Sequence, residues 1–129
     1  MLFSRQRENP LDHVEPVAGV EELLAIQAAV RDVEVKESVA TYLLSIVAAT
    51  RDHRDVELGA SPRGALALFR AAQARALLTG RAFVSPDDVQ ILAAPVLAHR
   101  LMLTTQARYG GTTSASIVQG IVAAVRVPT

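Results

Sequence analysis

The segment Gly-Ala-Ser-Pro-Arg-Gly-Ala at residues 59–65 has the features of a helix start. Ser61 is a good N-cap, because its hydroxyl can accept a hydrogen bond from a free backbone N–H of the first turn. Pro62 then occupies the first helical position, where it has no N–H to lose. Gly59 allows the preceding loop to turn sharply. The stretch therefore predicts a helix that begins at Pro62, and its apolar spacing carries that helix to Leu78.

Arg63 is the unusual residue of this helix start. The N-terminus of a helix carries a partial positive charge, so a cation in the first turn is locally unfavourable. Either Arg63 extends into water or an ion pair, or it faces an anion together with the helix N-terminus. One Ser-Pro-Arg does not decide between these interpretations. Arg70 lies two turns further on the same row, where it either makes the surface more soluble or supports a shared anion site.

Apolar residues at helical spacing predict four further helices, at residues 20–31, 36–52, 86–101 and 114–125. The third of these has a strong start, because Ser85 caps it and two acids in its first turn complement the helix dipole. Pro95 lies inside this helix and is expected to kink or break it. The helix from Pro62 is expected to stop at Gly80, a good residue for a helix end.

Each predicted helix carries an apolar stripe, and the stripe of the helix over 36–52 is expected to pack in the core. Residues 33–35 are expected to form a small strand or an extended link, residues 54–60 a loop, and residues 101–105 a partly extended segment. Alanine-rich sequences with few aromatic residues favour closely packed helices. The predicted fold is mainly α, a small bundle of four to five helices with at most a short two-stranded β element. The stripes contain the following residues: Leu23, Ile26 and Val30; Val39, Leu43, Ile46, Val47 and Thr50, with Tyr42 beside them; Ala65, Leu68, Phe69, Ala72 and Ala76; Val89, Leu92, Ala93 and Val96; Ile117, Ile121, Val122 and Val125.

Three further charged or titratable residues lie at helix ends, and structural roles explain them more simply than functional ones. Arg51 ends one predicted helix within a run of mixed charges, and we expect it to form an ion pair. His99 and Arg100 end another, where cations can cap the last carbonyl groups.

The composition excludes several classes of function. The chain has 129 residues, enough for one domain, with 13 acidic and 13 basic residues and no cysteine. A net charge of zero does not favour nucleic-acid binding or an anionic membrane surface. No metal site is expected, because thiolates are absent and the three histidines lack ligand spacing. No apolar run approaches the roughly 20 residues of a membrane span, and the polar start is too short for a signal peptide. A cytoplasmic protein without membrane insertion is the expectation.

Several short motifs together resemble a known family. Ala-Thr-Arg at 49–51 precedes Gly-Ala-Ser-Pro-Arg at 59–63, and Gly-Arg at 80–81, Val-Ser-Pro-Asp-Asp-Val at 84–89 and Val-Leu-Ala-His-Arg-Leu at 96–101 follow. In order and spacing they resemble the C-terminal lid subdomain of MoxR-type AAA+ ATPases, from about residue 15 to residue 101. Gly64 is a departure, because the family more often carries a small residue such as alanine there. Glycine loosens the helix start but leaves the arginine in place.

The resemblance implies an organisation and a site. Residues 1–18 would be a connector or hinge from the large AAA+ subdomain, residues 19–101 the helical lid, and residues 102–129 a strand and helix that pack on the lid. Ser61, Pro62, Arg63 and Gly64 would form the sensor-2 motif, in which Arg63 reaches the phosphates of ATP; Arg70 is a weaker addition. Mg²⁺ would be held by the large subdomain, because this sequence has no phosphate loop and no acidic pair for magnesium. The fragment alone is therefore not expected to bind or hydrolyse ATP.

The partners implied by the resemblance are the large AAA+ subdomain of the same protein and neighbouring subunits of a homo-hexamer. Family members also commonly work with von Willebrand factor A-type proteins in chaperone-like remodelling or maturation of complexes. An alternative is a stand-alone helical protein-interaction module without nucleotide chemistry. A helical DNA-binding domain is a third interpretation, but dispersed arginines and zero net charge argue against it.

Overall fold

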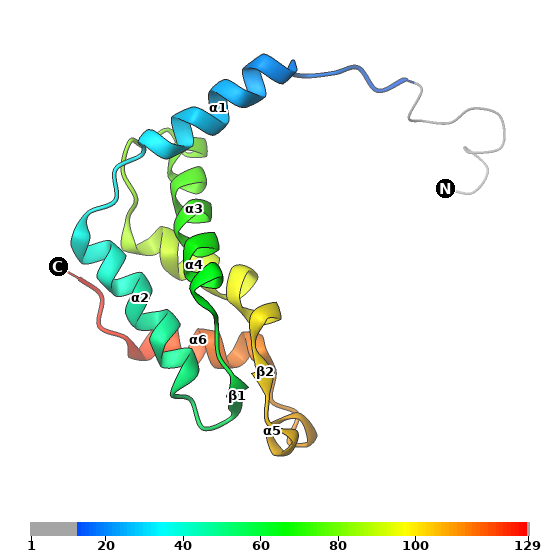
Figure 1. Ribbon diagram of the computed structural model, residues 1–129, viewed down its shortest axis with the longest axis vertical. Helices are drawn as coiled ribbons and strands as arrows, with labels where there is room; N and C mark the ends of the chain where they lie inside the picture. Colours follow the sequence, from blue (N-terminus) through cyan, green and yellow to red (C-terminus); the bar gives the residue numbers. More distant parts are fainter. Residues whose placement is uncertain (1–12, 129) are drawn as a thin grey trace.

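The computed structural model describes residues 13–128, which form a helical bundle with one small sheet (Figure 1). The mainly α fold with a two-stranded β element is thus confirmed. The described part holds six α-helices, one more than the upper number expected, because a five-residue helix is too short to show apolar periodicity. In chain order the elements are α1 (Val20–Asp32), α2 (Glu37–Arg51), β1 (Val56–Leu58), α3 (Pro62–Leu78), α4 (Pro86–Leu97), the 3-10 turn η3 (Ala98–Arg100), β2 (Met102–Leu103), α5 (Thr105–Tyr109) and α6 (Ser114–Ala124).

Helix α3 is the central element of the bundle, because it packs against α1, α2 and α4. Helix α6 covers α4 and α2 from the far side. The stripe predicted for α2 is buried throughout, which confirms it as part of the core. The largest fully buried side chains come from α2, α3, α4 and α6, and they include Ile46, Val47, Leu68, Val89, Leu97 and Val118.

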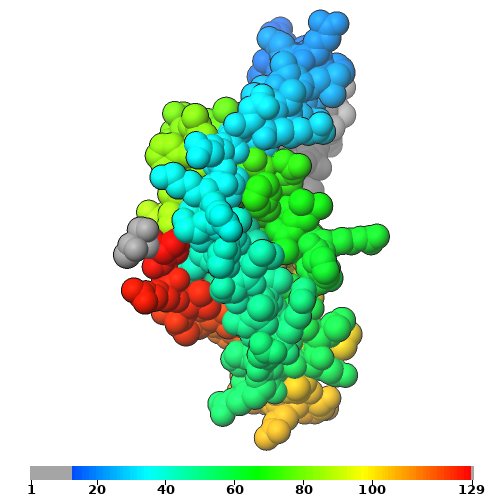
Figure 2. Space-filling view, turned by 60° about the vertical axis from the view of Figure 1, so that its left-hand side comes forward, coloured from blue at the N-terminus to red at the C-terminus, as the bar shows by residue number. Residues whose placement is uncertain are grey.

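Helix α1 differs from the other helices because none of its residues is buried. It lies at one end of the molecule and projects away from the bundle (Figures 1 and 2). The predicted apolar stripe is present, but Leu23 and Ile26 are 52% and 48% exposed. The connector expected before α1 can be followed only from residue 13, because residues 1–12 lie outside the described part. Residues 13–18 are exposed and form no α-helix.

Helix α4 begins as predicted, passes Pro95 and ends at Leu97, short of the predicted residue 101. The Asp88 carboxylate accepts hydrogen bonds from the backbone N–H of Ser85 (2.9 Å) and from its hydroxyl (3.0 Å). The helix does not break at Pro95 but runs on to Leu97, where it tightens into η3. Pro95 lies in the last turn of α4, so the helix loses a single backbone hydrogen bond near an end that is already loosely bonded.

The structure settles the conformation of the short segments between the helices. The expected loop at 54–60 contains β1, which pairs antiparallel with β2 so that Val56 lies opposite Leu103. The extended segment expected after residue 101 is confirmed as β2. Glu34 forms a single parallel bridge with Phe83, so residues 33–35 form an extended link with one bridging residue. The sheet fixes the chain immediately before the start of α3.

Candidate functional site

A hollow of about 710 Å³ lies at the start of α3. It gathers three guanidinium groups against one carboxylate, although these residues come from four separate segments of the chain. Such an excess of positive charge suits an anion, and guanidinium groups suit phosphate oxygens in particular. The residues that line the hollow are Arg51, Glu57, Leu58, Gly59, Ala60, Ser61, Pro62, Arg63 and Arg100.

Among the residues that the structure describes, Arg63 is the cation of this hollow that has no partner. It lies in the first turn of α3, its side chain is exposed, and no hydrogen bond or ion pair holds it among residues 13–128. The first turn of α3 contains no acidic residue, whereas that of α4 contains Asp87 and Asp88. The ion-paired alternative for Arg63 is therefore not seen within the described chain. The guanidinium is available to water or to a ligand.

Ser61 occupies the N-cap position, but its side chain does not act as predicted. Its backbone is extended, and its hydroxyl accepts no capping hydrogen bond. The backbone carbonyl of Ser61 instead accepts from the N–H of Gly64 at 2.8 Å and from the N–H of Ala65 at 3.2 Å. The tight first turn uses these donors, so the hydroxyl has no capping role. Pro62 follows at the first helical position, as predicted.

Gly64 brings a second arginine to the helix start, which the sequence did not indicate. A Cβ at this buried position would lie 3.4 Å from Arg100 Cδ, 3.5 Å from Ala60 Cβ and 3.6 Å from Leu97 Cδ2. The Arg100 guanidinium donates to the carbonyl of Val96 at 2.7 Å, which confirms its predicted role at the end of α4. His99 contacts the same guanidinium. Arg100 thus lies over the start of α3 and faces the hollow that contains Arg63.

Arg70 does not join this site. Its Nη1 donates to Oε1 of Gln73 at 2.9 Å, and its guanidinium lies 5.8 Å from the ring centroid of Phe69. It is absent from the lining of the hollow. Of the residues predicted for the site, Ser61, Pro62 and Arg63 line the hollow and Gly64 lies directly beside it, whereas Arg70 lies elsewhere along α3.

Arg51 has a different partner from the one expected. Its Nε donates to the backbone carbonyl of Ala60 at 2.9 Å, and it forms no ion pair within the described chain. The sequence could not indicate this contact, because it joins the last turn of α2 to a loop nine residues further along. Arg51 therefore lines the hollow and also holds the segment that leads into α3.

A second charged cluster lies near the other end of α3, and its charges are paired with one another. Arg81 donates to Asp88 at 2.8 Å and 2.6 Å, and Arg75 Nε lies 3.2 Å from the same carboxylate. Burial alone would raise the pKa of Asp88. Hydrogen bonds from Arg81 and Ser85, with the charge of Arg81, outweigh burial and lower that pKa to about 2. The hydrogen bond to Asp88 in turn raises the pKa of Arg81. This cluster joins α3 to α4 and leaves no free charge for a ligand.

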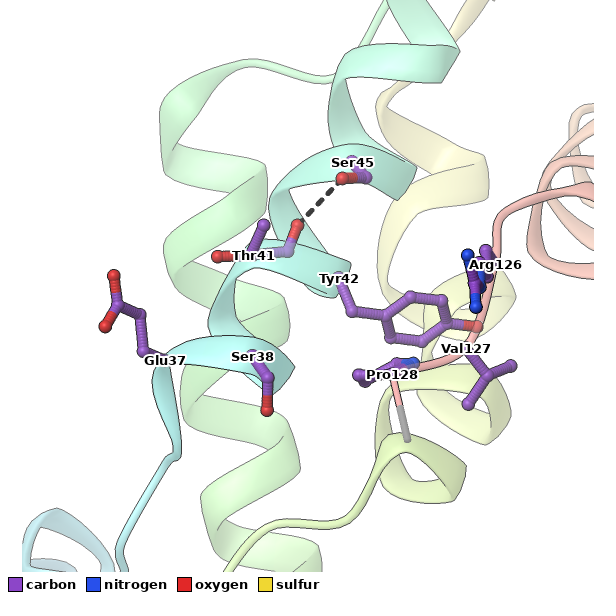
Figure 3. Close-up of a pocket in the computed structure, with 8 residues that line it drawn as sticks. All are labelled: Glu37, Ser38, Thr41, Tyr42, Ser45, Arg126, Val127 and Pro128. Atoms are coloured by element: carbon purple, nitrogen blue, oxygen red, sulfur yellow. Dashed lines mark hydrogen bonds between the residues drawn. The ribbon is translucent and has the colours of Figure 1, made fainter.

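A further hollow, of about 530 Å³, lies between α2 and the C-terminal segment (Figure 3). Tyr42 points from α2 toward this segment, while Glu37 and Arg126 lie on opposite sides. The hollow thus contains a single cation and several hydroxyl groups, a poorer match to a phosphate than the site at Arg63. The lining residues are Glu37, Ser38, Thr41, Tyr42, Ser45, Arg126, Val127 and Pro128.

Metal-binding clusters and membrane-spanning helices are both absent from residues 13–128. These residues hold no group of three or more histidine, aspartate or glutamate side chains that could bind a metal ion. None of their helices combines the length and the apolar character that crossing a bilayer would require.

Comparison with known proteins identifies the class of domain. Residues 48–121 match the AAA lid domain family. A solved structure from Cytophaga hutchinsonii, of a protein provisionally described as an ATPase, superposes with a TM-score of 0.88 at 27% identity; the match covers 98% of this chain and 41% of that one. The chain therefore belongs to the AAA lid domain family.

Two curated relatives place the chain more closely. It is 42% identical over 128 residues to the uncharacterised protein YeaC of Bacillus subtilis, covering 99% of this chain and 40% of that protein. It is 31% identical over 116 residues to the chaperone MoxR1 of Mycobacterium tuberculosis, covering 83% of this chain and 31% of MoxR1. The resemblance to MoxR-type proteins is confirmed, and the chain spans less than half the length of these relatives.

Proposed function

We propose that this chain is the lid of a MoxR-like AAA+ ATPase and that Arg63 is its sensor-2 arginine. The observation that carries the proposal is an exposed arginine in the first turn of α3 that has no partner among residues 13–128. Its hollow contains Arg51 and Arg100 as well, against the single carboxylate of Glu57. The matches to the AAA lid domain family and to MoxR1 support the same assignment.

The guanidinium group of Arg63 has the chemistry that a phosphate contact requires. It remains charged at every working pH and can donate two parallel hydrogen bonds to phosphate oxygens. Gly64 supports this role because its lack of a side chain lets Arg100 lie against the start of α3. ATP and ADP differ in phosphate charge and would attract Arg63 unequally. An arginine on a separate subdomain could therefore shift the lid between orientations as the nucleotide changes.

ATP is the cofactor that we propose. The hydrogen-bond donors of the hollow at Arg63 fit its phosphates better than those of the hollow beside Tyr42. Arg63 would contact the phosphates, with Arg100 and Arg51 beside it. The nucleotide supplies the phosphoanhydride bond that is hydrolysed. Mg²⁺ and the attacking water would be held by the large subdomain, because this sequence lacks the motifs for both.

The proposed partners are the large AAA+ subdomain of the same protein and neighbouring subunits of a homo-hexamer. We propose that the assembled cytoplasmic ATPase remodels or matures partner complexes, with von Willebrand factor A-type proteins among its partners. The name of MoxR1, a chaperone, supports a remodelling role.

The direct test is ATP hydrolysis by the polypeptide that joins this lid to a phosphate-binding subdomain. Arg63→Ala should lower kcat by about a hundredfold to a thousandfold, as expected when a charge-stabilising donor is removed. Arg63→Lys should restore part of the loss, because lysine keeps the charge but not the forked geometry. Arg54→Ala is the control, since the Arg54 side chain is 91% exposed and lies outside the hollow.

Two results would count against the proposal. Unchanged turnover in Arg63→Ala would remove the sensor-2 role. Absence of a phosphate loop from the complete coding region would favour the stand-alone interaction module instead, and the lid would then serve contacts between proteins.

A further inference from the structure

The last turn of α2 holds both backbone polar groups of a single residue ahead of α3. The hydroxyl of Thr50 accepts a hydrogen bond from the backbone N–H of Ala60 at 3.0 Å. The neighbouring residue Arg51 donates from Nε to the carbonyl of Ala60 at 2.9 Å. Both polar backbone groups of Ala60 are therefore held by consecutive residues of one helix. Ala60 lies three residues before Arg63, so this clamp fixes the chain just ahead of the free arginine.

The Thr50 side of the clamp is buried, whereas Arg51 is exposed. Thr50 and Ala60 are both 0% exposed. Thr50 also donates its hydroxyl proton to the carbonyl of Val47 at 2.6 Å, which fixes the orientation of its oxygen toward Ala60. The hydroxyl therefore donates to α2 and accepts from the loop, which uses its one proton and one of its two acceptor lone pairs.

Gly59 allows the loop to approach α2 this closely. A Cβ at Gly59 would lie 2.6 Å from Arg51 Cγ, 2.7 Å from its Cα and 2.8 Å from its N. Two of these atoms belong to the backbone of a helix and cannot move away cheaply. The absence of a side chain at residue 59 thus allows the backbone N–H and carbonyl of Ala60 to lie within hydrogen-bond distance of Thr50 and Arg51.

We propose that Thr50 and Arg51 are positioning residues for Arg63. They set the position and direction of the first turn of α3. Through the short connection Ser61–Pro62 they thereby orient the Arg63 guanidinium. This inference rests on the proposed function of Arg63 and adds to it the residues that orient the arginine. Thr50 is buried and uncharged, so any effect it has on hydrolysis must pass through other groups.

A double-mutant cycle on the polypeptide that carries lid and phosphate-binding subdomain tests the inference. Thr50→Val keeps the shape but leaves the Ala60 N–H without an acceptor. We expect it to lower kcat by about tenfold or more, because small misplacements of a catalytic group carry penalties of that size. In an Arg63→Ala background the same change should alter kcat by less than about twofold, since the group it positions is gone. Thr50→Ser, which keeps the hydroxyl, should restore kcat.

Asp88→Asn is the stability control, because it disturbs α3 and α4 at the end remote from Arg63. Below its melting temperature it should retain kcat and show no coupling to Arg63. If Thr50→Val fails to fold, Arg51→Lys replaces it in the cycle; it keeps the charge but loses the Nε donor.

The outcomes separate the two proposals. If Arg63→Ala lowers kcat while the effect of Thr50→Val is absent, or is equally large with and without Arg63, the positioning role is wrong and the sensor-2 role stands. If Arg63→Ala itself leaves kcat unchanged, the proposed function fails, and the positioning role fails with it.

Discussion

Two glycines flank the Ser-Pro-Arg stretch, and the structure explains in different ways why glycine occupies each position. Gly59 lies against the backbone of α2, where any side chain would collide with Arg51. Gly64 lies within α3, and a methyl group there would meet its neighbours at 3.4 Å or more. The first position requires glycine for close approach, whereas the second merely accepts it. The departure from alanine at residue 64 is therefore compatible with an intact helix start.

Substitution of each glycine should separate these roles. Gly59→Ala should lower the free energy of unfolding by about 1 to 3 kcal/mol, the usual cost of overpacking against a fixed backbone. Gly64→Ala should leave it unchanged or raise it by up to about 1 kcal/mol, because alanine favours the helix. Urea unfolding of the lid measures both. An equal loss of unfolding free energy in the two variants would contradict the conclusion that only residue 59 requires glycine.

Asp88 should make the stability of the lid depend on pH in the acidic range. Its pKa is lowered from 3.8 to about 2 in the folded state. A carboxylate with a lowered pKa stabilises the folded state when the pH is above the pKa of the unfolded state. This contribution is lost as the pH falls from about 4 through 2. The amount is about 2 kcal/mol, from the size of the shift.

Asp88→Asn should therefore be less stable than the parent at neutral pH and should show a flatter pH profile between about pH 4 and pH 2. Asp87→Asn, at the neighbouring exposed position, should cost less than about 1 kcal/mol. Thermal unfolding across this pH range provides the measurement. A parallel profile for Asp88→Asn and the parent would show that this carboxylate does not carry the dependence.

At the scale of elements, the sequence predicted what depends on local signals. The start of α3 at Pro62, the start of α4 after Ser85 and the buried stripe of α2 all follow from neighbours a few residues apart. The left-handed Gly80, with φ of 74°, likewise ends α3 as expected. Helix α5 and strand β1 were missed because each is short, and β1 depends on a partner that lies far along the chain.

The candidate site shows the same division. Arg63 could be singled out because its charge conflicts with the helix end at which it lies. Arg100 and the contact between Arg51 and Ala60 could not, because folding alone brings them to the hollow. The predicted association of Arg70 with Arg63 was not found, since spacing along a helix does not determine where a long side chain finds its partner.

Helix α1 offers a prediction at this scale. Leu23 and Ile26 form an apolar face that the described chain leaves about half exposed. Leu23→Gln with Ile26→Gln should change the free energy of unfolding of the lid by less than about 1 kcal/mol, because little burial is lost. Leu68→Gln, at a position that is 0% exposed, should cost several times more. A large loss in the α1 variant would show that this helix contributes to the core.

On the scale of the whole molecule, the two ends of α3 carry different features. The hollow with Arg63 lies at its start, near β1, whereas α1 packs near its other end (Figure 1). The buried cluster around Asp88 ties α3 to α4 between adjoining helix ends. A rigid bundle of this kind can transmit a movement from its arginine end as a change of orientation of the entire lid.

The most direct measurement is a structure of the polypeptide that joins this lid to its phosphate-binding subdomain, determined with a non-hydrolysable ATP analogue. The account predicts a guanidinium nitrogen of Arg63 within about 3 Å of a phosphate oxygen. A guanidinium turned away from the phosphates, or paired with a carboxylate of the large subdomain, would contradict it.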